Sequence, residues 1–155
     1  MNEFDLSGLA QIAGVPLLQA RNWTSGRPLH IRPSVQTAFG KGTRNLYSDS
    51  DAFKLAIANK LRDGGVAFRA IRYVVEHVDP EDFVYDGRAD WLILSVTKDQ
   101  ISARAVPDKD FVKAMTDEFT NTKAVHHFAQ LSDLLGEVLA RIERYEKEPG
   151  EHDET

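Results

Sequence analysis

The sequence predicts an α+β fold, with a helix-turn-helix in its N-terminal half and a small α/β domain in its C-terminal half. Two short segments with helical apolar spacing flank the breaker Gly14-Val15-Pro16, and further helical spacing continues to His77. After Asp79 the pattern changes to two short strand-like segments around a polar turn. The chain of 155 residues is long enough to bury a core for one ordinary domain or two small ones.

The charge of the chain is unevenly distributed, although its net value is only −5. Residues 1–79 hold 10 Lys or Arg against 7 Asp or Glu, which gives +3, whereas residues 80–155 sum to −8. No carboxylate lies between Leu6 and Ser48. A surface of this kind favours a polyanion, and the acidic half would repel one, so we expect nucleic-acid contacts in the first half alone.

The first two predicted helices are short. Apolar residues at 6, 9, 10 and 13 share one helical face, and either Asp5 or Ser7 is suited to cap it. Pro16 suits the first position of the second helix, which we expect to end near Gly26-Arg27-Pro28. Two helices joined by a glycine turn form a unit whose second helix can enter the DNA major groove.

A basic loop and two more helices complete the N-terminal half. The string Gly40-Lys41-Gly42-Thr43-Arg44 lies between apolar Phe39 and Leu46 and predicts a hairpin loop. Ser48 or Asp49 then caps a third helix that stops at Gly64-Gly65, and a fourth runs from about Ala67 to His77. Asp79-Pro80 marks our predicted boundary, so residues 1–79 form the first domain, residues 80–148 the second and residues 149–155 an acidic tail.

The C-terminal half predicts a hairpin followed by helices. Segments 91–96 and 101–106 flank the turn Lys98-Asp99-Gln100, and a helix follows around residues 111–119. Two alternatives remain for residues 123–130, because apolar spacings of four and three from Ala124 to Tyr145 also fit one long coiled-coil helix. We favour a third strand and then a final helix capped by Ser132.

The order and spacing of motifs in the first half resemble the N-terminal DNA-binding domain of the MerR family. The matching motifs are Leu9-Ala10, Gly14-Val15, Arg21-Asn22-Trp23, Pro33, Gly42-Thr43-Arg44, Tyr47-Ser48, Asp51, Leu55, Leu61-Arg62, Gly65-Val66 and Ile71. The resemblance implies a winged helix-turn-helix whose dimers bind and distort promoter DNA. Leu17 and Leu18 depart from the family pattern, which has a more polar pair there, as does Asn22, which replaces an aromatic residue.

Carried over to this chain, the resemblance implies DNA contacts from the second helix, the segment after it and the wing. Cations in these places suit phosphates, and side-chain amides suit the edges of adenines. We expect Trp23 to pack beneath the wing more than to touch DNA. The expected DNA-binding residues are Gln19, Arg21, Asn22, Trp23, Arg27, His30, Arg32, Lys41, Thr43, Arg44 and Tyr47.

The last helix carries an apolar stripe, formed by Leu135, Val138, Leu139 and Ile142, that we expect to close the C-terminal core and to meet a second copy in a homodimer. We thus expect the C-terminal domain either to dimerise the protein or to bind an unknown effector or protein partner. Trp91 is the only residue that suggests a ligand pocket there. The chain has no cysteine, and the adjacent His126 and His127 point in different directions. We therefore expect no catalytic residues, no metal and no cofactor.

The sequence as a whole predicts a DNA-binding transcriptional regulator with double-stranded DNA and a second copy as its partners. Since Met1 to Asp5 has no signal-peptide character and no segment is apolar over a membrane-spanning length, we expect a cytoplasmic protein, on the nucleoid when bound. An antitoxin or phage accessory protein is one alternative. A winged-helix module that binds proteins and not DNA is another.

Overall fold

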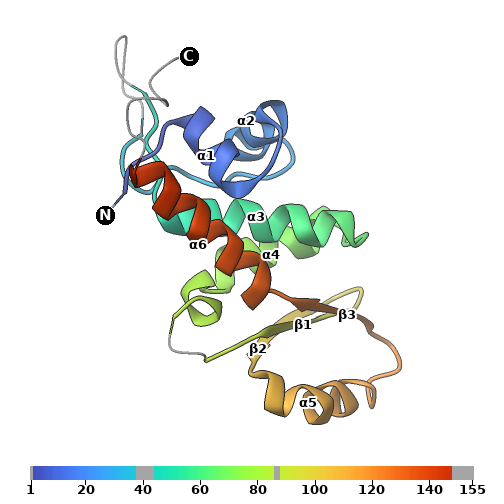
Figure 1. Cartoon of the computed structure of the whole chain (residues 1–155). Helices are drawn as coiled ribbons and strands as arrows, with labels where there is room; N and C mark the ends of the chain where they lie inside the picture. Colours follow the sequence, from blue (N-terminus) through green and yellow to red (C-terminus); the bar gives the residue numbers. More distant parts are fainter. Residues whose placement is uncertain (1, 38–43, 86–87, 148–155) are drawn as a thin grey trace. The chain divides into compact units, whose positions relative to one another are not determined.

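The computed structural model describes residues 2–37, 44–85 and 88–147 and has the predicted mixture of helices with an antiparallel sheet (Figure 1). Its described residues form two compact units, one from Met1–Asn59 and Glu137–Thr155 and the other from Lys60–Gly136. The limits of these units fall inside two long helices, α3 (Asp49–Asp63) and α6 (Ser132–Lys147). Each unit is described separately below.

The first unit begins with the two short helices that the sequence predicts, α1 (Leu6–Ala13) and α2 (Leu17–Ser25). The Asp5 carboxylate caps α1 by accepting a hydrogen bond from the Gly8 amide at 2.8 Å. Gly14 ends α1 with a φ of +74°, a left-handed conformation that glycine adopts without a steric penalty. Pro16 lies at the N-cap, one position before its expected place, because α2 begins at Leu17.

The C-terminal half of α6 packs against α1 within this unit. Tyr145 meets the ring of Phe4 edge to face, with centroids 5.2 Å apart, and Arg141 donates a hydrogen bond to the carbonyl of Ile12. Phe4 is also paired with Tyr47 through an antiparallel bridge, so the chain before α1 and the chain before α3 are held together. A second bridge joins Gln36 to Leu46. The tip of the predicted hairpin, with Lys41 and Thr43, lies outside the described residues.

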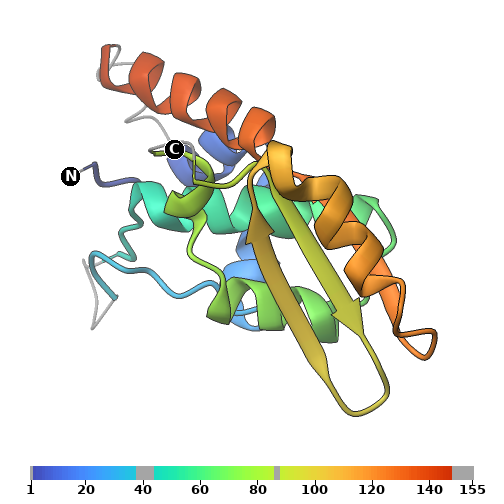
Figure 2. The same ribbon diagram turned by 90° about the horizontal axis from the view of Figure 1, so that it is seen from below.

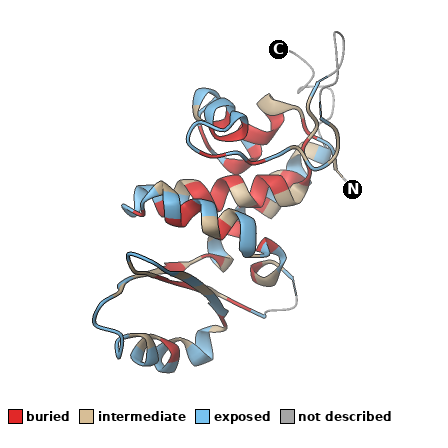
Figure 3. Ribbon diagram, turned by 180° about the vertical axis from the view of Figure 1, so that it is seen from behind, coloured by how far each residue is buried: buried red, intermediate tan, exposed pale blue. Residues whose placement is uncertain are grey.

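The start of α3 is fixed by a buried polar cluster. Asp51, only 1% exposed, accepts hydrogen bonds from the Ser48 amide at 2.9 Å and the Ser34 amide at 3.0 Å. The Ser48 hydroxyl accepts in return from the Asp51 amide at 3.4 Å, which is the reciprocal arrangement of a capping box. Most of α3 is coloured as buried in Figure 3. Nearby, burial raises the pKa of the Asp49 carboxyl, although a hydrogen bond from the Asn2 amide opposes that rise.

The second unit contains a three-stranded antiparallel sheet in the order β2-β1-β3. The predicted hairpin is confirmed as β1 (Trp91–Val96) and β2 (Ile101–Val106), with Trp91 opposite Val106. Residues 125–130 are a strand, β3 (Val125–Gln130), which confirms the alternative that we favoured. Figures 1 and 2 show these strands with α5 (Phe111–Glu118) along one face.

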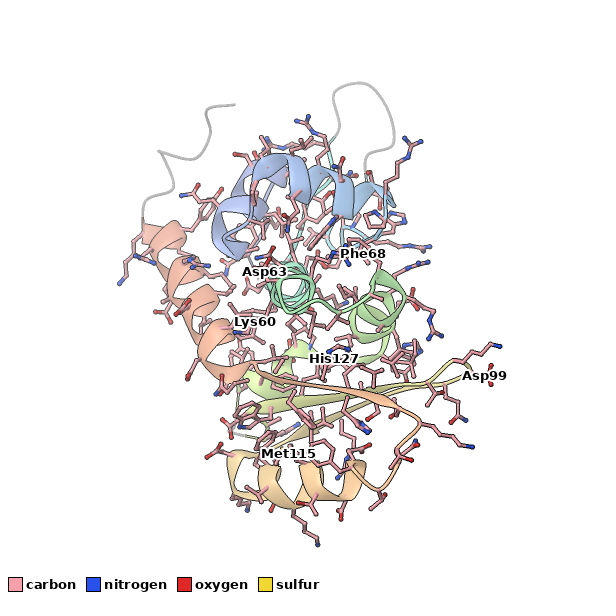
Figure 4. All side chains as sticks on the ribbon, turned by 90° about the vertical axis from the view of Figure 1, so that its right-hand side faces the viewer. Lys60, Asp63, Phe68, Asp99, Met115 and His127 are labelled. Atoms are coloured by element: carbon pink, nitrogen blue, oxygen red, sulfur yellow. The ribbon has the colours of Figure 1, made fainter. Side chains whose placement is uncertain are left out.

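The two faces of the sheet are both covered in this unit, which explains why four of the six residues of β1 are buried. On the α5 side, Ile93 packs with Val106 and Ala114, and Trp91 stacks on Phe111 at 4.0 Å. In Figure 4, Met115 and His127 lie on opposite sides of the sheet. Helix α4 (Phe68–His77) is tied to the hairpin by Arg69, which donates to the carbonyl of Thr97 at 2.8 Å.

Candidate nucleic-acid interface

Helix α2 presents one face to the core and the other to solvent. Ala20, Trp23 and Thr24 are buried, which leaves Arg21 and Asn22 exposed on the outer face. Because a helix advances 100° per residue, the outer face also includes Leu18 and Ser25, one turn away on either side. The exposed face of α2 therefore combines a guanidinium, an amide, a hydroxyl and apolar side chains.

Internal contacts hold α2 in place. Trp23 is only 6% exposed, and its carbonyl accepts a hydrogen bond from the Ile31 amide at 2.9 Å. The Thr24 hydroxyl donates to the Ala20 carbonyl within the helix. Gln19 is half-buried, and its side-chain amide donates to the Asn59 side chain at 2.7 Å. Gln19 and Trp23 thus support the helix from inside.

The segment after α2 alternates between core and surface. Leu29 and Ile31 are each 1% exposed, while His30 and Arg32 between and beyond them are exposed. Arg27 is exposed as well. The buried leucine and isoleucine anchor the segment, and its basic side chains remain at the surface.

A groove of about 630 Å³ brings two of the predicted phosphate-binding residues together. Arg21 from α2 and Arg44 from the chain after the undescribed residues 38–43 both line it, whereas Arg27, His30 and Arg32 do not. Its other lining residues include apolar and hydroxyl-bearing side chains, and they are Asp5, Leu6, Ser7, Leu17, Thr24, Ser25, Asn45 and Tyr47. Two guanidiniums beside one carboxylate leave this groove with a net positive charge.

Asp5 also lines this groove, whereas the sequence analysis considered it only as a helix cap. Its carboxylate lies 3.5 Å from the guanidinium of Arg44, in addition to capping α1. The side chain of Arg44 is 68% exposed, so this ion pair is weak and leaves most of the guanidinium available to a ligand. Asp5 stands one residue before the acid-free segment, and only the fold brings it next to Arg44.

The remaining predicted site residues lie in different environments. Tyr47 is only 2% exposed, and its ring belongs to the core beneath the groove. In α6, Leu135, Val138 and Ile142 are buried within this single chain, while Leu139 is half-buried.

The second unit holds a polar cluster that the sequence analysis also did not identify. The Ser95 hydroxyl lies 2.9 Å from Glu118 Oε2 and 2.8 Å from Nδ1 of His126. In a hydrolytic triad the carboxylate orients the histidine, but here Glu118 binds the serine and the Arg104 guanidinium. Nε2 of His126 faces the Asn121 carbonyl. This arrangement ties β1, β3 and α5 together and lacks the order of a charge-relay system.

Replacing Asp5 with asparagine should strengthen DNA binding. Asparagine caps helices about as well as aspartate, so α1 should remain intact. The substitution removes a negative charge beside Arg44, and one such charge near a phosphate costs on the order of 1 kcal/mol in water, or about fivefold in affinity. We expect this gain in a fluorescence-anisotropy titration at low salt, with a smaller gain at high salt. Equal affinities of Asp5→Asn and wild type at low salt would contradict it.

Among residues 2–37, 44–85 and 88–147, no helix is both long enough and apolar enough to span a membrane.

Comparison with known proteins gives a partial match. No protein-family model matches the sequence. Over 68 residues the chain is 37% identical to proteins named as uncharacterized HTH-type transcriptional regulators, from Mycobacterium bovis and from two strains of Mycobacterium tuberculosis. The aligned stretch is 44% of this chain and 29% of each relative, so the chain covers less than a third of their length. Over that stretch, this chain is therefore similar to proteins whose names place them among regulators of the helix-turn-helix type.

Proposed function

We propose that this protein is a transcriptional regulator that binds specific sequences in duplex DNA through a MerR-like winged helix-turn-helix. The observation that carries the proposal is that Arg21, on the outer face of α2, and Arg44 line the same groove. Both residues belong to the segment from Leu6 to Ser48, which contains no carboxylate. The names of the mycobacterial relatives support it independently.

In this proposal α2 is the recognition helix. Its outer face enters the major groove, where Arg21 contacts a phosphate and Asn22 contacts a base edge. Arg27, His30 and Arg32 contact the backbone from the next segment. The segment from Gln36 to Leu46 acts as the wing, and Arg44 carries its contact to a second phosphate; Lys41 and Thr43 are assigned to the same wing from the sequence alone.

The proposal assigns separate roles to the two parts of the sequence. Residues 1–79 bind DNA, and residues 80–148 dimerise the protein or sense a partner, followed by the acidic tail at 149–155. Because Leu135, Val138 and Ile142 are buried in the chain itself, we assign the contact with a second copy to Leu139 and the exposed residues beside it on α6. Two copies would then read the two halves of a palindromic site.

Selection from a random duplex pool tests the proposed function. The full chain should enrich a palindromic sequence at moderate salt, and light scattering should give the mass of a dimer. Binding to unselected duplex DNA should be measurable at low salt and should weaken steeply as salt rises. If the protein binds no duplex at low salt, DNA binding is refuted and the alternative of a protein-interaction module gains.

A further inference from the structure

Two large apolar side chains are exposed at the start of α2. Leu17 is 44% exposed and Leu18 is 64% exposed. The other large apolar side chains that are exposed in the described part of the chain all belong to the second unit, and they are Tyr85, Val112, Phe119 and Val125. In the described part of the first unit, exposed large apolar surface is thus confined to the first turn of α2.

This position is the one from which a recognition helix reaches the bases. Helix α2 begins at Leu17, so both leucines occupy its first turn. The N-terminal residues of a recognition helix contact base edges in the major groove. Leu18 shares the outer face with Arg21 and Asn22, at helical separations of three and four residues. Leu17 differs, because it lines the groove together with Arg21.

The charge around the leucines selects the occupant of this surface. No carboxylate occurs from Leu6 to Ser48, and Arg21 and Arg44 lie in the neighbouring groove. A polyanion that also presents an apolar group to the protein would complement such a surface. In duplex DNA that feature is the C5-methyl group of thymine, the apolar group that base pairs present in the major groove.

We infer that Leu18 contacts the methyl group of a thymine and thereby fixes an A·T pair at one position of each half-site. The inference rests on the proposed function and adds to it the base that α2 reads. A leucine has no hydrogen-bonding group, so it favours thymine through apolar contact alone. Asn22, on the same face, is positioned to bond a neighbouring base edge.

The test uses the duplex recovered by selection, with each thymine replaced singly by deoxyuridine, which lacks only the methyl group. A single replacement at the contacted thymine of one half-site should weaken binding by the wild-type protein about fourfold, as expected for the loss of one buried methyl group. Leu18→Ala should bind the thymine and uracil duplexes equally. Val112→Ala removes an equally exposed apolar side chain from α5 and should keep the wild-type response.

The outcomes separate this inference from the proposed function. If wild type binds the selected duplex but no uracil replacement weakens it, the thymine contact is refuted and DNA binding stands. The same conclusion follows if Leu18→Ala is weakened by uracil as much as wild type is. It also follows if Leu18→Ala changes only the mass measured by light scattering, and that result would assign Leu18 to a protein contact. If the pool yields no bound duplex, both fail. Circular dichroism should show that Leu18→Ala is folded, and the uracil series on wild type decides the matter without any variant.

Discussion

The double substitution Arg21→Ala with Arg44→Ala should weaken the binding of each protomer to its half-site about a hundredfold at moderate salt. Both guanidiniums line one groove and extend into solvent, so they can bind phosphates from adjacent elements. A hydrogen bond to a charged group contributes about 1.5 kcal/mol, which corresponds to roughly tenfold in affinity for each arginine. Anisotropy titrations of the two single variants and the double variant measure this effect.

The salt dependence of binding gives a second measure of the same prediction. Removing one arginine–phosphate interaction should reduce the slope of log K against log salt by about 0.9, so the double variant should lose about 1.8 for each protomer and about 3.6 for the proposed dimer. Lys113→Ala is the matched control, because it removes one exposed positive charge from α5 in the other unit. A drop in affinity in Lys113→Ala as large as in Arg44→Ala would show that net charge, and not the groove, governs binding.

The pair formed by Arg44 and Asp5 allows the groove to be tested by a double-mutant cycle. The gain expected for Asp5→Asn depends on Arg44, because the carboxylate lies 3.5 Å from that guanidinium. Combined with Arg44→Ala, the Asp5→Asn substitution should therefore have a smaller effect on DNA affinity.

Local patterns in the sequence were enough to predict most of the fold. The ends of α1 and α2 follow from Asp5, Gly14 and Gly26, each of which satisfies or terminates the backbone hydrogen bonds of its own helix. The hairpin of β1 and β2 was predicted correctly because its strands are adjacent in the chain and their polar turn is short.

The region after residue 123 was harder to predict, because its apolar spacing fits a helix as well as a strand. The structure favours the strand, since β3 pairs along its whole length with β1, a partner that is distant in the sequence. Gln130 then marks the change to helix: its side-chain oxygen accepts from the Asp133 amide, and its nitrogen donates to Ser132. Such a distant pairing leaves no trace in local periodicity.

The sequence was enough to predict which charged residues belong to the candidate site, but not which of its residues are buried. Arg21, Arg27, Arg32 and Arg44 are exposed, as contact with phosphates requires. By contrast, Tyr47 is buried. Because a tyrosine side chain has an apolar ring and a polar hydroxyl, the sequence alone does not decide whether it lies in the core or at the surface. Gln19 is engaged with Asn59, 40 residues later, and Asp5 is engaged with Arg44 over a similar separation. Contacts at this range depend on the tertiary fold.

Replacing Asp51 should strongly reduce the stability of the fold. Its carboxylate is buried, and Oδ2 accepts hydrogen bonds from the Ser48 amide, the Ser34 amide and the Ser34 hydroxyl. Asp51→Ala leaves the buried Ser48 amide without its acceptor and removes the two bonds that hold Ser34 to the start of α3. Removing one partner from a buried charged network costs about 3 kcal/mol, so urea unfolding followed by circular dichroism should show a decrease of that size in the free energy of unfolding.

The same cluster should link stability to DNA binding. Ser34 and Ser48 flank the bridge between Gln36 and Leu46, and this bridge holds the chain that carries Arg44. At temperatures where Asp51→Ala remains folded, we therefore expect weaker DNA binding although the variant keeps every exposed charge. Asp63→Ala is the matched control, because it removes an exposed carboxylate from the end of the same helix and should change stability by less than about 0.5 kcal/mol. If Asp51→Ala unfolded at the same urea concentration as Asp63→Ala, the capping cluster would not be what fixes the start of α3.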